Sequence, residues 1–223
     1  MLLADARFPS GDPAHSGGME AACAVGLVTD IETLRSFLYG RLWTVGVVGA
    51  VVAAAVCARA ESSSSTSLFR AAEAELDARI PSPAARNASR LQGSHVLRLA
   101  LTVTNSPILD TLSRATVSSF QRPHYPIAIG AVAKVAEATP EEAAEAAAYA
   151  SVAGPAFAAR SLLRLDAQIV TRLGVEMAPD VLRVAADAAL RGTRPLSEIP
   201  AHGAPALEYL AEEHAARPRS FAS

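Results

Sequence analysis

An uncharged apolar stretch, LWTVGVVGAVVAAAVCA, occupies Leu42 to Ala58 and lies between Arg41 and Arg59. Its length stands at the lower limit of the roughly 17 to 25 residues that a helix needs to cross a bilayer. Much of it is alanine and glycine, whose transfer into lipid is only weakly favourable. The stretch therefore predicts a buried central helix and not a membrane span. Its small side chains would let neighbouring helices, or a partner subunit, approach closely.

The composition supports a bundle of helices around this one. Hydrophobic residues make up 51% of the 223 residues and aromatic residues only 5%, so the core is built mainly from alanine, leucine and valine. Alanine is the best helix former, and no stretch shows the period-two alternation of a half-buried strand. We expect an all-α protein, a single-domain bundle of about nine or ten helices over residues 1–223, with a flexible N-terminal segment.

Several helix starts share one signature, a hydroxyl residue at the N-cap followed by proline at the first helical position. Proline is tolerated there because its missing N–H would have no helical partner in any case. A further helix is expected to begin near Pro126. The hydroxyl–proline starts are Ser82-Pro83, Ser106-Pro107 and Thr139-Pro140.

Capping residues and helix breakers predict other boundaries. Thr29, with Glu32 three residues on, predicts a capping box and a helix from about Ile31. Proline inside a helix removes a backbone hydrogen bond and clashes with the preceding turn, so EEAAEAAAYASVAGPAFAARSLLRL is predicted to bend or break at Gly154-Pro155. The segment APDVLRVAADAALRG predicts a helix that ends at Gly192. APALEYLAEEHAA predicts the last helix.

The sequence lacks the signatures of common enzymes and of nucleic-acid-binding proteins. It has no GxxxxGK[ST] phosphate loop, no HExxH, no CxxC pair and no GxSxG elbow. The net charge is -2, and the arginines are dispersed among acidic residues without a basic face, which argues against nucleic acid. Cys23 and Cys57 are far apart, which indicates no disulfide framework and favours a reducing cytoplasm. These observations favour a binding or scaffolding role.

Direct nickel binding is the main alternative to a scaffolding role. Neither His15 with Cys23 nor His124 with Tyr125 has the i, i+4 spacing that places two ligands on one helical face. A single histidine more often has a structural or surface role, although a symmetric dimer could bring two copies of one histidine together. His15 and Cys23 are the weak candidates for a nickel metallochaperone, and Cys57 is expected in the core.

Two pairs of arginines are candidates for contact with a partner. Arg86 and Arg90 are one helical turn apart, as are Arg160 and Arg164, so each pair is expected to project from one helical face. They are either solvated charges that contribute little, or they anchor a partner or complete a buried polar network. The sequence leaves these alternatives open, and an arginine finger for a partner GTPase is a further one.

Four blocks, in order along nearly the whole chain, resemble the urease accessory protein F family. LLADARFPSGDPAHSGGMEAAC resembles the family's LADxxxPxGxxxxSxGxE pattern before the first helix, and PAARNASRLQGSHVLRLA resembles its middle segment. HYPIAIGAVA resembles its His-x-Pro-x-x-x-Gly helix start, and PALEYLAEEHAARPRSFAS resembles its C-terminal PALDxxxxxHExxxxRLFxS. The order and spread of the blocks make the resemblance specific.

This resemblance implies an all-helical accessory protein with no active site and no cofactor of its own. Family members bridge a second accessory protein, D (H in some bacteria), and the GTPase G, and the assembly inserts nickel into apo-urease in a GTP-dependent way. The resemblance also implies a homodimer that regulates the GTPase, and a C-terminal tail that docks on the D protein. The composition and the apolar stretch lead us to expect a cytoplasmic protein with neither a nucleic-acid nor a membrane partner. The residues implied in partner contact are Ser16, Gly17, Gly18, Glu20, Arg86, Arg160, His214, Arg219, Phe221 and Ser223.

The chain departs from the family pattern at three places, one of which is the tail, where Arg219-Ser220-Phe221 stands in place of Arg-Leu-Phe and loses one apolar contact. Ala14-His15 lies where the family has an aromatic-Ser-Tyr/His-Ser run, which lowers the case for His15 as a ligand and favours the opening loop as a contact surface. Leu163 to Asp166 replaces the end of a common Arg-Leu-Ile-Pro-Leu-Gly-Gln segment, of which Arg160 and the apolar positions carry over.

Overall fold

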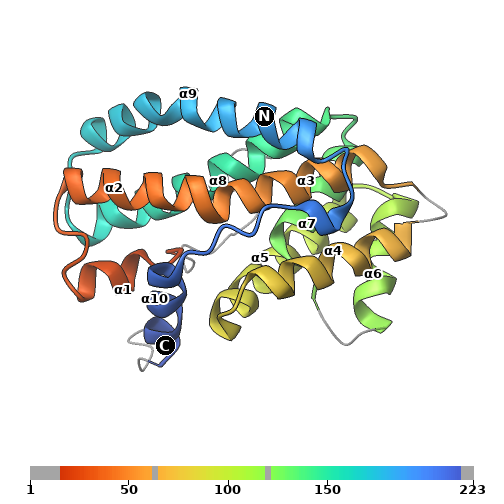
Figure 1. Ribbon diagram of the computed structural model, residues 1–223, viewed down its shortest axis with the longest axis horizontal. Coiled ribbons are helices and arrows are strands. Elements are labelled where there is room, and N and C mark those ends of the chain that lie inside the picture. The colour runs from red at the N-terminus through yellow and green to blue at the C-terminus, as the bar shows by residue number, and fades with distance from the viewer. Residues whose placement is uncertain (1–15, 62–64, 119–121, 217–223) are drawn as a thin grey trace.

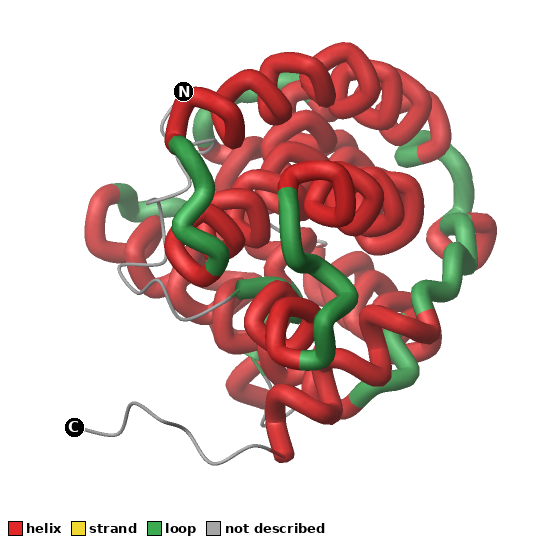
Figure 2. The backbone as a smooth tube through the Cα atoms, turned by 90° about the vertical axis from the view of Figure 1, so that its left-hand side faces the viewer, coloured by secondary structure: helices red, strands yellow, loops and turns green. Residues whose placement is uncertain are grey.

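The computed structural model describes residues 16–61, 65–118 and 122–216 (Figure 1). These residues form ten α-helices and no strand, which confirms the all-α prediction (Figure 2). A π-helical turn, η2 (Leu42–Gly46), joins α2 to α3, and a short 3-10 helix, η3 (Leu196–Glu198), precedes α10. The α-helices are α1 (Met19–Ala24), α2 (Ile31–Arg41), α3 (Val47–Arg59), α4 (Ser65–Arg79), α5 (Pro83–Val103), α6 (Pro107–Ser118), α7 (Tyr125–Val135), α8 (Pro140–Leu162), α9 (Ala167–Arg191) and α10 (Pro205–Ala216).

Helix α3 is the buried centre of the fold, as its uncharged sequence predicts. Every residue from Val47 to Cys57 is buried, and α3 packs against α7, α8 and α9 (Figure 1). In the part of the chain that the structure describes, the run Ile31–Arg59 is the one helix long and apolar enough to cross a membrane. Because 72% of its most apolar window is buried inside the protein, this run is explained as a core helix.

Glycines let the helices around α3 approach closely. A Cβ atom on Gly130 of α7 would lie 2.5 Å from the carbonyl oxygen of Ala53 on α3. On Gly93 of α5, it would lie well under 3.0 Å from the carbonyl oxygen of Pro123, just before α7. Real Cβ atoms essentially never come so near, so only glycine fits these two crossings. Both glycines belong to sequence blocks that resemble the family, and the structure gives those blocks a packing role.

The predicted starts of α2, α5, α6, α7 and α8 agree with the structure, whereas the capping residue of α2 differs. Helices α5, α6 and α8 begin at the predicted prolines, and α7 begins at Tyr125. The predicted capping box of Thr29 and Glu32 is wrong by one residue, because the N-cap of α2 is Asp30. Asp30 Oδ1 accepts a hydrogen bond from the Thr33 backbone N–H (2.9 Å), and Thr33 Oγ1 accepts one from the Asp30 N–H (3.0 Å).

Two internal prolines do not interrupt their helices. Helix α8 continues through Pro155 to Leu162, so the predicted break does not occur. Helix α9 begins at Ala167, well before the predicted APDVLRVAADAALRG segment, and continues through Pro179 to its C-cap at Gly192. Its N-cap is Asp166, whose side chain accepts hydrogen bonds from two backbone N–H groups of the first turn. Pro179, at the start of the predicted segment, lies in the middle of the helix.

Candidate partner-binding surface

The opening block and the C-terminal helix of the chain meet on one surface. Helices α1 and α10 lie side by side at one end of the molecule (Figure 1). In their contact, His214 Nδ1 lies 3.4 Å from Glu20 Oε2, and both side chains are about half exposed. Leu210 is the buried residue of α10, and a Cβ atom added to Gly18 would lie 3.9 Å from its Cβ, an ordinary van der Waals distance. The structure thus brings together three of the candidate contact residues, Gly18, Glu20 and His214.

The described part of the opening block, Ser16–Gly18, forms a capped turn, which we call the signature loop. Gly17 and Gly18 have φ angles of 58° and 89°, a left-handed conformation that side chains disfavour. Ser16 is buried, and its Oγ accepts a hydrogen bond from the Glu20 N–H at 3.3 Å. This loop therefore gives α1 a fixed start. His15 lies outside the described residues.

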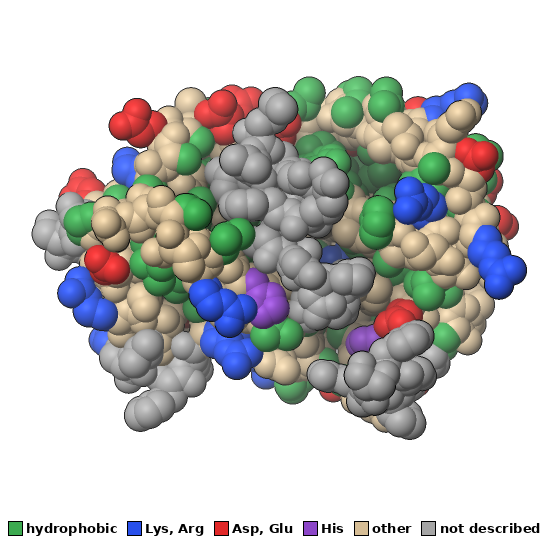
Figure 3. Space-filling view, turned by 180° about the vertical axis from the view of Figure 1, so that it is seen from behind, with side chains coloured by type: hydrophobic (Ala, Val, Ile, Leu, Met, Phe, Trp, Pro, Cys, Tyr) green, Lys and Arg blue, Asp and Glu red, His purple; other side chains and the backbone are tan. Residues whose placement is uncertain are grey.

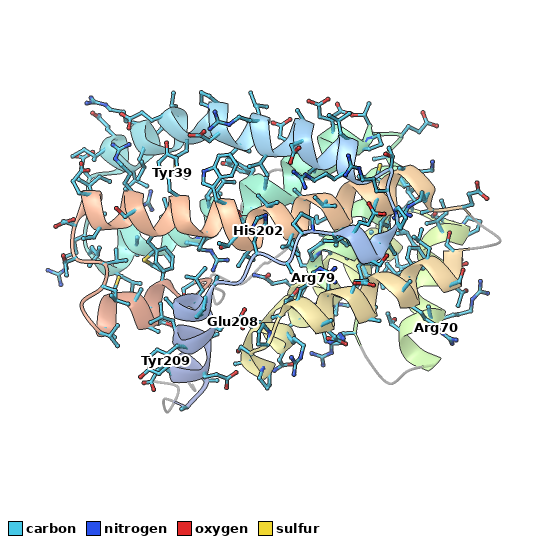
Figure 4. All side chains as sticks on the ribbon, viewed as in Figure 1. Tyr39, Arg70, Arg79, His202, Glu208 and Tyr209 are labelled. Carbon is cyan, nitrogen blue, oxygen red and sulfur yellow. The ribbon has the colours of Figure 1, made fainter. Side chains whose placement is uncertain are left out.

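Two glutamates dock α10 onto the start of α5. Glu208 Oε2 accepts a hydrogen bond from the Ser82 N–H at 2.8 Å, and Glu212 Oε1 accepts from the Ala84 N–H at 3.0 Å and from Ser82 Oγ. Carboxylates are stabilised at a helix N-terminus by its unpaired N–H groups and dipole. The two donors lower the pKa of Glu212, whereas burial raises that of Glu208. Glu208 lies on the side of α10 that faces α5 (Figure 4). The next residue, Tyr209, is 61% exposed.

Arg86 and Arg90 belong to a polar cluster inside the chain. Arg90 pairs with Asp77 through Nη2 at 2.8 Å and with Glu73 through Nη1 at 3.1 Å, both on α4. Arg86 Nη1 donates to the carbonyl oxygen of Ile80 at 2.6 Å, just after α4 ends. Of the alternatives that the sequence left open for this pair, the structure favours a partly buried network over free solvated charges.

His124 completes this cluster and is fully buried. Its Nδ1 lies 3.0 Å from Ser89 Oγ and its Nε2 lies 3.1 Å from Asp77 Oδ1. Burial lowers the pKa of His124 to about 4, so the ring is neutral at pH 7. Burial also raises the pKa of Glu73 to about 7. His124 thus has the structural role that is commonest for a single histidine.

Arg160 and Arg164 do not share a helical face, and that prediction is wrong. Helix α8 ends at Leu162, and Arg164 has a φ of 54°, in the turn before α9. Arg160 instead lies over the ring of Phe157, 4.7 Å from its centroid, in a cation–π contact. Phe157 is 50% exposed, so this pair remains on the surface of α8 as a candidate contact.

The cysteines do not form a metal site with the described residues around them. Among residues 16–61, 65–118 and 122–216, no three histidine, cysteine or acidic side chains are placed to hold a metal ion. Cys57 is buried in the core as predicted, and its Sγ donates to the carbonyl oxygen of Ala138 at 3.3 Å. Cys23 is partly buried, which raises its pKa and disfavours the thiolate that a metal requires.

Charged side chains of the described residues form no purely basic or purely acidic patch on the visible part of the face opposite to that of Figure 1. On the visible part of that face, basic and acidic side chains of the described residues are interspersed (Figure 3). The dispersed arginines of the sequence therefore remain dispersed here. The predicted tail contacts Arg219, Phe221 and Ser223 lie outside the described residues.

Sequence reasoning missed Arg41 and the acidic pair Glu208 and Glu212. Arg41 was noted only as the charged boundary of the apolar stretch, yet its guanidinium turns inward and bonds backbone carbonyls of two other segments. Glu208 and Glu212 are four residues apart, a spacing that places both on one face of a helix. That spacing was visible in the sequence, but their acceptor role depends on a distant helix start.

Comparison with known proteins agrees with the family resemblance of the four sequence blocks. The family model described as UreF matches residues 28–178. A urease accessory protein UreF of Mycobacterium sp. (strain JLS) is 43% identical over all of this chain and 97% of its own length. The UreF protein of Mycobacterium marinum is 39% identical over the same shares, and that of Mycobacterium tuberculosis is 37% identical over 98% and 94%. The chain therefore belongs to the UreF family of urease accessory proteins.

Proposed function

We propose that this chain is a non-enzymatic scaffold in urease maturation, which bridges the D (H) accessory protein and the GTPase G. In this role it is required for GTP-dependent insertion of nickel into apo-urease and regulates the GTPase. Nickel and GTP are then handled by the other proteins of the complex, and the chain acts in the cytoplasm as a homodimer. Membership of the UreF family supports a role in urease maturation.

One structural observation carries the scaffold proposal: α1 and α10 share a surface. The two ends of the chain hold two of the blocks that resemble the family, and the fold brings the described parts of these blocks into contact. We expect the D protein to bind this surface and the tail, with Arg219 and Phe221 as anchors.

Size-exclusion chromatography after co-expression tests this assignment. With the D (H) and G proteins of a mycobacterial relative, the full chain is expected to elute as a complex of all three. Deletion of residues 217–223 is expected to remove the D protein from the complex, while far-UV circular dichroism of the chain stays helical. Phe221→Ser should weaken the complex, and Arg217→Ala, in the same tail, serves as the matched control.

The outcomes separate the parts of the proposal. If the truncated chain retains the D protein, the tail assignment is wrong. If the full chain binds neither D nor G, the scaffold proposal is wrong. Calorimetry with Ni²⁺ tests the metallochaperone alternative, because micromolar binding that His15→Ala or Cys23→Ala abolishes would favour direct nickel binding over a scaffold.

A further inference from the structure

Pro155 leaves one backbone acceptor of α8 without its helical donor. In an α-helix, the N–H of each residue bonds the carbonyl four residues earlier, and proline has no N–H. The acceptor that loses its partner is the carbonyl oxygen of Ser151, in the middle of α8. Arg41 of α2 supplies the missing hydrogen bond, because its Nε donates to that oxygen at 2.9 Å. This contact explains how α8 continues through an internal proline without a break.

The same guanidinium also holds the signature loop. Arg41 Nη1 donates to the carbonyl oxygen of Gly17 at 2.6 Å. Gly17 packs on the ring of Pro155 so closely that a Cβ atom on it would lie 2.9 Å from Pro155 Cγ. Within the described residues, the guanidinium of Arg41 donates to the carbonyl oxygens of Ser151 and Gly17. One side chain thus connects α2, the proline turn of α8 and the loop that starts α1.

The surroundings of Arg41 favour a fixed position. It is the last residue of α2, and the π-helical turn η2 follows directly. In that turn, a Cβ atom on Gly46 would lie 2.7 Å from Ser151 Oγ, so η2 and α8 touch where Arg41 makes its bond. Burial lowers the pKa of Arg41 to about 10, which leaves the group charged at pH 7. Hydrogen bonds from a charged group are stronger than those between neutral groups.

We propose that Arg41 is a positioning residue, which fixes the signature loop against α8 and thereby sets the geometry of the surface shared by α1 and α10. The link to α10 passes through Gly18, which precedes α1 and faces Leu210, and through Glu20, which contacts His214. The inference that this geometry serves D-protein binding rests on the proposed function. The positioning itself rests on the contacts of Arg41 alone.

Amide hydrogen exchange of Arg41→Met measures the positioning directly. The Ala22 N–H bonds the Gly18 carbonyl at 2.9 Å, and the Met19 N–H bonds the Ser16 carbonyl at 3.0 Å. Both amides should exchange about tenfold faster or more in the variant, because a hydrogen bond to a charged group is lost, while the amides of α3 stay protected. Arg35→Met is the matched control, since Arg35 is also on α2 but pairs with Glu176 at 2.7 Å. It should leave the exchange of α1 unchanged.

A double-mutant cycle with Pro155→Ala separates this role from general stability. Alanine in place of this proline supplies an N–H that can bond the Ser151 carbonyl, so Arg41 is no longer needed there. The loss of stability caused by Arg41→Met is expected to be clearly smaller in the Pro155→Ala background than in the wild type. If Arg41→Met alone fails to fold, the double variant is expected to fold, and α1 exchange is measured in it against Pro155→Ala. Equal losses in the two backgrounds, or unchanged exchange at Ala22, would overturn the proposal.

Binding of the D protein distinguishes the failure of this inference from the failure of the proposed function. Arg41→Met is expected to bind the D protein about tenfold more weakly than the wild type and Arg35→Met. If all three bind equally well, the link between Arg41 and the binding surface is wrong and the scaffold role stands. If the wild type does not bind while α1 exchange still depends on Arg41, the proposed function is wrong and the positioning role stands.

Discussion

Replacement of Gly93 by alanine is expected to lower the free energy of unfolding by about 3 kcal/mol or more, because it overpacks the crossing of α5 with the start of α7. The added Cβ would lie 2.7 Å from the carbonyl carbon of His124 and 2.8 Å from the Tyr125 nitrogen. These are backbone atoms, which cannot move aside as a flexible side chain can. The buried His124 cluster would be displaced with them. Urea unfolding followed by far-UV circular dichroism measures the loss.

Gly174→Ala is the matched control for this effect. Gly174 is also inside a long helix, α9, but a Cβ atom there meets nothing within 4 Å. Alanine in an exposed helix interior is favoured over glycine by about 0.5 to 1 kcal/mol, so this variant should be more stable than the wild type. A Gly93→Ala protein as stable as the wild type would show that α5 and α7 do not cross as closely as described.

Loss of Arg90 is expected to have an effect of similar size. The side chains of Arg90 and Glu73 are only 12% and 13% exposed, and at alkaline pH, where Glu73 is ionised, removal of Arg90 leaves a buried charge without its partner, which costs about 3 to 5 kcal/mol. Arg90→Met keeps the apolar stem and removes the charge. The control is Arg191→Met, because Arg191 pairs with Asp187 at 2.6 Å on the exposed face of α9, and such surface pairs contribute about 1 kcal/mol or less.

The cost of Arg90→Met is also expected to depend on pH. Burial raises the pKa of Glu73, and Arg90 opposes that rise; burial lowers the pKa of His124, and Arg90 lowers it further. Both pKa values therefore increase without Arg90. A carboxyl whose pKa is raised in the folded state destabilises the protein as the pH rises above the pKa of that carboxyl in the unfolded chain. A histidine whose pKa is lowered less by folding costs the protein less stability in acid. The loss should thus be larger at about pH 8 than at about pH 5, and an equal loss at both would contradict this account of the cluster.

Local signals predicted much of this fold. The hydroxyl–proline starts of α5, α6 and α8 are correct because N-capping depends on neighbouring residues only. The uncharged stretch predicted the core helix because its burial follows from its own composition. The α9 start was missed because the predicted segment begins beside Pro179, whereas the true cap, Asp166, has no proline beside it. The capping box of α2 was misplaced because Thr29 and Asp30 are both good caps and adjacent.

The candidate site was less accessible to sequence reasoning, because it depends on contacts between distant segments. Nothing local shows that Arg41 turns toward the Ser151 carbonyl, or that Glu208 and Glu212 bind the start of α5. The family blocks identified Glu20 and His214 as candidates, but only the fold shows that they lie in contact. Where the interacting atoms lie far apart in the sequence, residue type predicts the kind of contact and not its partner.

The nickel content of urease tests the central claim most directly. Urease of a mycobacterial relative is co-expressed with its D (H) and G accessory proteins and nickel, either with this chain in place of the relative's own UreF or with no UreF protein. With the chain present, the purified urease is expected to contain nickel and to hydrolyse urea. Without it, nickel and activity should fall to the background of apo-urease. Equal nickel content and equal activity with and without the chain would contradict its role in nickel insertion.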